Sequence, residues 1–118
     1  MATLAPKTLA KKIIRLIWDK KADGITLLNL KRLSSVTDYF VICSVGSDIQ
    51  ARVVADAVIE GLEDRRVVSH VEGYEAGRWI LIDCYNVVLH IFHPDVREYY
   101  GLERLWGDAE REEYPDGP

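Results

Sequence analysis

The chain has few of the residue types that build metal sites and disulfide frameworks. Its 118 residues include two cysteines, Cys43 and Cys84, and three histidines. Both cysteines lie in apolar runs typical of buried strands, so we expect reduced thiols of a cytosolic protein. His90 and His93 are three positions apart on an expected strand and point to opposite faces, so they cannot share one ion. We predict no metal and no cofactor.

Long apolar runs are also missing. None approaches the roughly 18 residues that a membrane span requires, and the N-terminal residues lack the layout of a signal peptide. A composition of 48% hydrophobic and 29% charged residues suits one compact domain. We expect a cytoplasmic protein with a single domain over residues 1–107 and a disordered acidic tail over residues 108–118.

The charge is unevenly distributed. Residues 1–21 hold six basic residues against Asp19 alone, a net charge of +5, which leaves −9 for the other 97 residues of a chain whose total is −4. The acidic remainder of the chain is poorly suited to binding nucleic acid along its length. It is better suited to binding a basic protein. The basic cluster is typical of a solvated helix face, with at most peripheral contact to RNA phosphates.

Hydrophobic periodicity predicts alternating helices and strands before residue 72. Ser47 followed by Gln50 forms a capping box at the start of the second helix. A right-handed crossover through that helix would make the flanking strands parallel. The expected elements are a helix over residues 8–21, strands over 25–30 and 39–45, a helix over 48–65 and a strand over 67–71.

Residues 78–93, RWILIDCYNVVLHIFH, predict a β-hairpin with its turn at Cys84-Tyr85. A two-residue turn would place Trp79 opposite His90. Because side chains alternate between the faces of a sheet, the two faces differ in chemistry. One face is purely aliphatic and carries Ile80, Ile82, Val87, Leu89 and Ile91. The other carries Trp79, Leu81, Asp83, Asn86, Val88, His90 and Phe92.

These elements predict an α/β fold, a mixed five-stranded sheet with helices mainly on one face. Short helical pieces over residues 94–100 and 102–106 complete the chain. Because both long helices can share the aliphatic face, we expect the Trp79 face to be open and to bind a ligand or partner. A further layer of the domain and a homodimer through this face are alternatives.

The sequence offers little for catalysis. The patterns of P-loops, Rossmann folds, zinc sites and nucleophile elbows are absent. Gly46-Ser47 before a helix could hold a phosphate, as in nucleotidyltransferases, but the neighbouring strands lack the paired acids that such enzymes need. An ordinary helix cap is favoured there. We predict no catalytic residues and no enzyme, with a nucleotide-binding protein as the alternative.

Several runs resemble the Iojap family of ribosomal silencing factors, over about residues 8–108. They are DYFVICS from Asp38, the Gly-Ser turn with Asp48, HVEGYEAGRWILID from His70, VVLHIFH from Val87 and REYYGLERLWGD from Arg97. The resemblance implies a fold related to a reduced nucleotidyltransferase. It also implies binding to ribosomal protein fourteen of the large ribosomal subunit, which sterically blocks subunit joining and represses translation. In organelles, relatives take part in large-subunit assembly through the same contact, which is the alternative role.

Trp79 occupies the family's position in the RW element, and we expect it to be the central anchor of the interface. Its expected neighbours are Tyr74, Glu72, His90, Tyr99 and Leu102. The chain departs from the family in the hairpin turn, where Tyr85-Asn86 replaces the usual glycine and acidic residue. Tyrosine tolerates a positive φ poorly, so this turn leaves the cross-strand register open.

Overall fold

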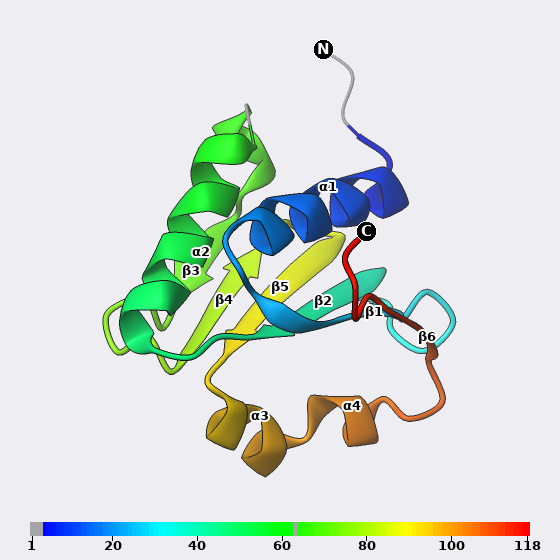
Figure 1. Cartoon of the computed structure of the whole chain (residues 1–118). Coiled ribbons are helices and arrows are strands. Elements are labelled where there is room, and N and C mark those ends of the chain that lie inside the picture. The colour runs from blue at the N-terminus through cyan, green and yellow to red at the C-terminus, as the bar shows by residue number, and fades with distance from the viewer. Residues whose placement is uncertain (1–3, 63) are drawn as a thin grey trace.

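The computed structural model describes residues 4–62 and 64–118, which form one mixed sheet with the strand order β3-β4-β5-β2-β1-β6 (Figure 1). Residues 1–3 of the expected domain and residue 63 of the expected second helix lie outside the described part. The helices are α1 (Pro6–Asp19), α2 (Asp48–Gly61), α3 (Pro94–Tyr100) and α4 (Leu102–Leu105). The strands are β1 (Asp23–Asn29), β2 (Tyr39–Ser44), β3 (His70–Glu72), β4 (Trp79–Asp83), β5 (Val87–Phe92) and β6 (Glu110–Glu113).

The main core lies between the sheet and the α1–α2 layer. The central strand β2 pairs in parallel with β5 and antiparallel with β1, and both of its faces are covered. All five aliphatic residues expected on the core face of the hairpin are buried there, which confirms the predicted alternation. The mixed α/β class is therefore confirmed.

A capping interaction joins the two long helices to each other. The Ser47 hydroxyl accepts a hydrogen bond from the Gln50 amide at 3.0 Å, as the capping box predicts. The Gln50 side chain accepts from the Gly46 amide at 2.7 Å and donates to the Lys21 carbonyl at 3.1 Å. Gln50 thus caps α2 and fixes the end of α1 beside it.

The predicted register of the β4–β5 hairpin is wrong by two residues. Trp79 lies opposite Phe92, not opposite His90, and the turn residues are Tyr85 and Asn86. Tyr85 adopts the φ of +66° that a glycine normally supplies, and its amide donates to the Asp83 carboxylate at 2.8 Å. A shift of two residues preserves side-chain alternation, so the predicted faces are unchanged.

The strand expected over residues 67–71 begins later, at His70. Val67 and Val68 instead pack against the main core, with Val67 ending a 3-10 turn. β3 pairs antiparallel with β4 at the edge of the sheet. It runs parallel to β2, as expected, but β4 and β5 lie between the two strands.

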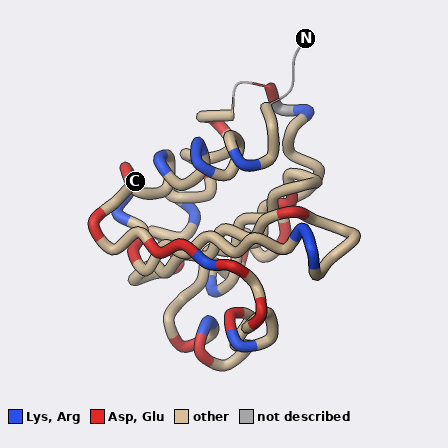
Figure 2. Tube along the Cα trace, turned by 90° about the vertical axis from the view of Figure 1, so that its right-hand side faces the viewer, with Lys and Arg blue, Asp and Glu red and all other residues tan. Residues whose placement is uncertain are grey.

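Within residues 4–62 and 64–118 the sheet has six strands, so the prediction of five is wrong. The additional strand is β6, which lies in the segment 108–118 that we expected to be disordered. It pairs antiparallel with β1 and covers an edge whose amides and carbonyls would otherwise lack partners. Its exposed residues are acidic except for Arg111, as Figure 2 shows along the strand facing the viewer. Backbone pairing with β1, together with the packing of Ala109 and Tyr114 on the two apolar clusters, explains why this acidic segment is ordered.

The second face of the sheet is partly covered, contrary to the expectation of an open face. Figure 1 shows α3 and α4 on the side opposite α1 and α2. Partly buried side chains of this segment, including Val96, Leu102 and Trp106, pack on a second cluster that contains Phe92. The face was expected to be open because the C-terminal helical pieces are too short for their packing side to be derived from periodicity.

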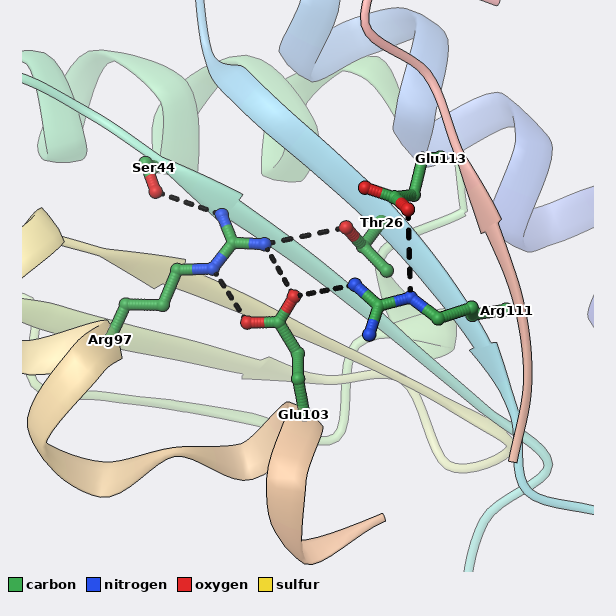
Figure 3. A network of polar contacts seen from close by, with 6 residues as sticks. All are labelled: Thr26, Ser44, Arg97, Glu103, Arg111 and Glu113. Atoms are coloured by element: carbon green, nitrogen blue, oxygen red, sulfur yellow. Dashed lines mark hydrogen bonds and ion pairs between the residues drawn. The ribbon is translucent and has the colours of Figure 1, made fainter. Parts of the chain in front are cut away.

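A polar network attaches these short helices to the sheet (Figure 3). The Arg97 guanidinium of α3 donates two hydrogen bonds to the Glu103 carboxylate of α4, both at 2.9 Å. It also donates to the Ser44 hydroxyl of β2 at 2.8 Å and to the Thr26 hydroxyl of β1 at 3.3 Å. Glu103 accepts a further bond from Arg111 of β6 at 3.1 Å. One arginine therefore connects four elements directly.

Among the described residues, two other than glycine have a positive φ, and they generate a prediction about stability. Lys21 follows α1 with φ +72°, and Tyr85 has φ +66°. In the left-handed region of backbone conformation, glycine avoids a steric cost of roughly 1–2 kcal/mol that other residues bear. It lowers stability by roughly 0.5–1 kcal/mol because the unfolded chain has more conformational entropy with glycine. We expect Lys21→Gly and Tyr85→Gly each to raise the free energy of unfolding by about 0.5–1 kcal/mol in urea titrations.

Lys20 provides the matched control, because it is the neighbouring lysine and has φ −102°. Lys20→Gly should lower the free energy of unfolding. Equal effects of Lys20→Gly and Lys21→Gly would contradict the assignment of strain to the left-handed conformation.

Candidate protein-binding surface

Three aromatic side chains form a continuous exposed surface at the start of β4. The Trp79 ring lies 4.7 Å from the Tyr100 ring, and Tyr100 lies 5.1 Å from Tyr99, measured between ring centroids. Tyr99 is 80% exposed and Tyr100 is 53% exposed, while Trp79 is partly buried. We call these three residues the aromatic surface. Large, rigid aromatic groups of this kind dominate many protein interfaces.

His90 supports Trp79 from below. The Trp79 Nε1–H group donates to His90 Nδ1 at 3.1 Å, so the ring hydrogen of the neutral imidazole lies on Nε2. His90 stacks on Phe92, with parallel rings 5.8 Å apart, and meets Phe40 edge to face at 4.5 Å. Burial lowers the pKa of His90 to about 4, so the imidazole is neutral at physiological pH. A neutral ring is the form that can accept from Trp79.

The loop before β4 sets the position of Trp79. Gly73 has φ +78°, and a Cβ atom there would overlap the Trp79 carbonyl oxygen. The Tyr74 hydroxyl donates to Asp56 of α2 at 2.9 Å, and Arg52 of α2 donates to the Glu75 carbonyl at 2.9 Å. The loop is therefore held against α2 on one side while its glycine allows close approach to the strand.

A polar rim borders the aromatic surface. Glu72 lies opposite Leu81, which places its side chain on the Trp79 face. His70 lies beside it, with His70 Nε2 2.7 Å from the Glu72 carboxylate and His70 Nδ1 3.8 Å from the Asp83 carboxylate. Leu81 and Val88 are partly exposed on the same face. The face therefore combines apolar groups with two carboxylates.

The predicted site residues do not all lie together. Trp79, Tyr99 and Leu102 lie on the same side of the sheet, and exposed Glu72 lies at its edge. His90 belongs to the same face but is only 3% exposed, so it supports the surface from beneath. Tyr74 packs against the main core and α2, on the other side of the sheet. Alternation could not predict the face on which Tyr74 lies, because this residue precedes the strand.

Tyr100 was not predicted as a site residue. It lies four positions after Val96, which packs on the second cluster. Residues four apart lie on the same face of a helix. That spacing was the available signal, but its use required knowing that the segment 94–100 packs on the Trp79 face.

Metal, thiol and phosphate sites were considered among the residues that the structure describes. Among them, no group of three or more His, Cys, Asp or Glu side chains could hold a metal ion. Burial raises the pKa of Cys43 to about 12 and that of Cys84 to about 11, which keeps both thiols protonated and unreactive. The Gly46 amide and the Ser47 hydroxyl, which a phosphate would use, already bond to Gln50.

No helix in the part of the chain that the structure describes is both long and apolar enough to cross a membrane.

The fold and the aromatic surface define a small α/β protein with features of a protein-binding module. The family model described as "Ribosomal silencing factor during starvation" matches residues 3–117, and the chain belongs to this family.

Related proteins agree with this assignment. The chain is 38% identical over 107 residues to the ribosomal silencing factor RsfS of Halalkalibacterium halodurans, covering 90% of this chain and 92% of the relative. It is 42% identical over 92 residues to RsfS of Bacillus subtilis, covering 77% and 78%. A crystal structure of protein CV0518 from Chromobacterium violaceum matches with a TM-score of 0.84 and 31% identity, covering 88% of each chain. The relation to a nucleotidyltransferase fold stays a prediction.

Buried His90 generates a prediction about pH. In the unfolded chain a histidine binds a proton as the pH falls below about 6.5, whereas folded His90 does so only near pH 4. Acid therefore favours the unfolded state in this window. We expect His90 to account for a loss of about 2 kcal/mol in unfolding free energy between about pH 7 and about pH 5.

His90→Gln isolates this contribution, because glutamine can accept from Trp79 but does not titrate. Urea unfolding at both pH values should show a smaller acid-induced loss for the variant than for the unmodified chain. Equal losses would contradict a buried neutral imidazole. His70 and His93 are present in both proteins and cancel in the comparison.

Proposed function

We propose that this chain is a translation repressor that binds ribosomal protein fourteen of the large ribosomal subunit and blocks subunit joining. It acts by occupying space and catalyses no reaction, and its place of action is the cytoplasm. Membership of the ribosomal silencing factor family supports this proposal. The single observation that supports the proposed contact with this partner is the aromatic surface, in which we take Trp79 to be the anchor.

The surface suits a basic partner protein. Trp79 is fixed by the hydrogen bond to His90 and by contact with Phe92, at 4.9 Å between ring centroids. A side chain that is already fixed loses little conformational entropy on binding. Glu72 and Asp83 supply negative charge beside it, within a body of net charge −9 outside residues 1–21. Such complementarity favours association with a basic protein. RNA contact, if made, is confined to the exposed basic residues of α1.

The size of the protein explains how binding would prevent joining. Its principal extents are 35, 32 and 27 Å. Direct contacts between two macromolecular surfaces require atoms within about 4 Å. A rigid body of this thickness, seated where the subunits meet, would hold the two surfaces apart there.

Tyr99 provides the test of this surface. Because it is 80% exposed, Tyr99→Ala should leave the stability of the fold unchanged. We expect it to weaken binding to purified large subunits by roughly tenfold or more, as truncation of an interface aromatic does. Light scattering should show that the unmodified chain blocks joining when preincubated with large subunits, and that the variant blocks it less.

Tyr85→Ala is the matched control, since Tyr85 is 60% exposed and lies in the turn at the far end of the hairpin. It should bind like the unmodified chain. Equal losses for both variants would refute the assignment of the surface. Intact binding without inhibition of joining would favour the alternative role in large-subunit assembly, which uses the same contact at another time.

Trp79→Ala is a less direct test. It removes the hydrogen bond to His90 and the contact with Phe92, so the fold itself should lose stability, though less than the roughly 3–5 kcal/mol that truncation of a fully buried tryptophan costs. A free homodimer through the aromatic surface is a further alternative, in which dimerisation would compete with ribosome binding by mass action. Sedimentation of the unmodified chain and Tyr99→Ala across concentrations would detect it.

A further inference from the structure

Two of the three residues of the aromatic surface belong to a helix that is weakly attached by apolar packing. Neither α3 nor α4 has a buried residue. Helices of seven and four residues are too short to be stable alone. Gly101, with φ +57°, forms the corner between the two helices. Because glycine is conformationally permissive, this corner alone does not fix how α3 lies on the sheet.

Arg97 ties α3 to the sheet through the hydrogen bonds of its side chain. Its side chain is 15% exposed and that of Glu103 is 23% exposed, so the pair is largely shielded from water. The guanidinium donates to Glu103, Ser44 and Thr26, which belong to α4, β2 and β1 (Figure 3). These bonds point in different directions from one planar group, and together they fix both the height and the rotation of α3 over the sheet.

The same helix carries Tyr99 and Tyr100 two and three residues further on. A small rotation of α3 would move Tyr100 away from Trp79, to which it lies at 4.7 Å between ring centroids. We infer that Arg97, with Glu103 as its counter-ion, is a positioning residue that sets the geometry of the aromatic surface for its partner. This inference rests on the proposed function, because it assigns the role through partner binding.

Arg97→Lys is the informative variant. Lysine keeps the positive charge but offers a single ammonium group, which cannot reach both Glu103 oxygens, Ser44 and Thr26 together. We expect Arg97→Lys to weaken binding to purified large subunits by about tenfold, measured at a temperature where the variant is folded. Arg66→Lys is the control, because Arg66 forms an exposed ion pair with Asp64 at 3.0 Å, away from α3. It should bind like the unmodified chain.

A double-mutant cycle separates positioning from a general loss of stability. If Arg97 acts by placing the tyrosines of α3, Arg97→Lys should cost much less affinity when Tyr99 is already alanine. Additive losses for Arg97→Lys and Tyr99→Ala would overturn the inference. So would unchanged affinity of the folded Arg97→Lys variant.

The indole N–H signals in a nitrogen-proton correlation spectrum give a readout that needs no partner. The chain has three tryptophans, Trp18, Trp79 and Trp106. Arg97→Lys should shift the signals of Trp79 and Trp106, which pack in the cluster beside α3 and α4, and leave that of Trp18 on α1 in place. If the unmodified chain fails to bind large subunits, the proposed function fails, and these signals alone decide the inference. Unchanged Trp79 and Trp106 signals would then overturn it.

Discussion

The hydrogen bonds made by Arg97 and Glu103 join parts of the chain that lie far apart in the sequence. Arg97 reaches Ser44 and Thr26, which are 53 and 71 residues away in sequence. A buried or half-buried guanidinium is tolerated only where its donors are satisfied, and here Glu103 supplies both the counter-charge and two acceptors. Because Glu103 also accepts from Arg111, the pair extends to the edge strand β6. The pair therefore connects the short helices on the second face to three strands of the sheet.

The two faces of the sheet follow different physical rules. The face toward α1 and α2 is aliphatic and closely packed, and it supplies most of the apolar burial. The other face combines aromatic rings, one buried imidazole and polar groups that bond in specific directions. Directional contacts fix individual side chains, which suits a surface that a partner recognises. Aliphatic packing on the opposite face stabilises the sheet on which that surface is built.

Much of the fold was predictable because the relevant signals are local. Alternation assigned the residues of β4 and β5 to the correct faces, even though the register was wrong, because an error of two residues does not change which face a strand residue occupies. Asn86, which was expected on the Trp79 face, is a turn residue. Ser47 and Gln50 predicted the start of α2 correctly. The positive φ of Tyr85 could not be predicted from local signals. This unfavourable conformation persists only because strand pairing on both sides requires a tight turn.

The sequence by itself determined the mixed α/β class, the chemistry of the two hairpin faces, the place of Trp79 on the non-aliphatic face and the family resemblance. Tertiary structure decided which parts of that face remain exposed, that His90 is buried and that Tyr74 lies on the other side of the sheet. It also decided that an acidic segment forms β6. The physical reason is that periodicity describes neighbours along the chain. The covering of a sheet face, and the pairing of its edges, depend on contacts between distant residues that no local pattern encodes.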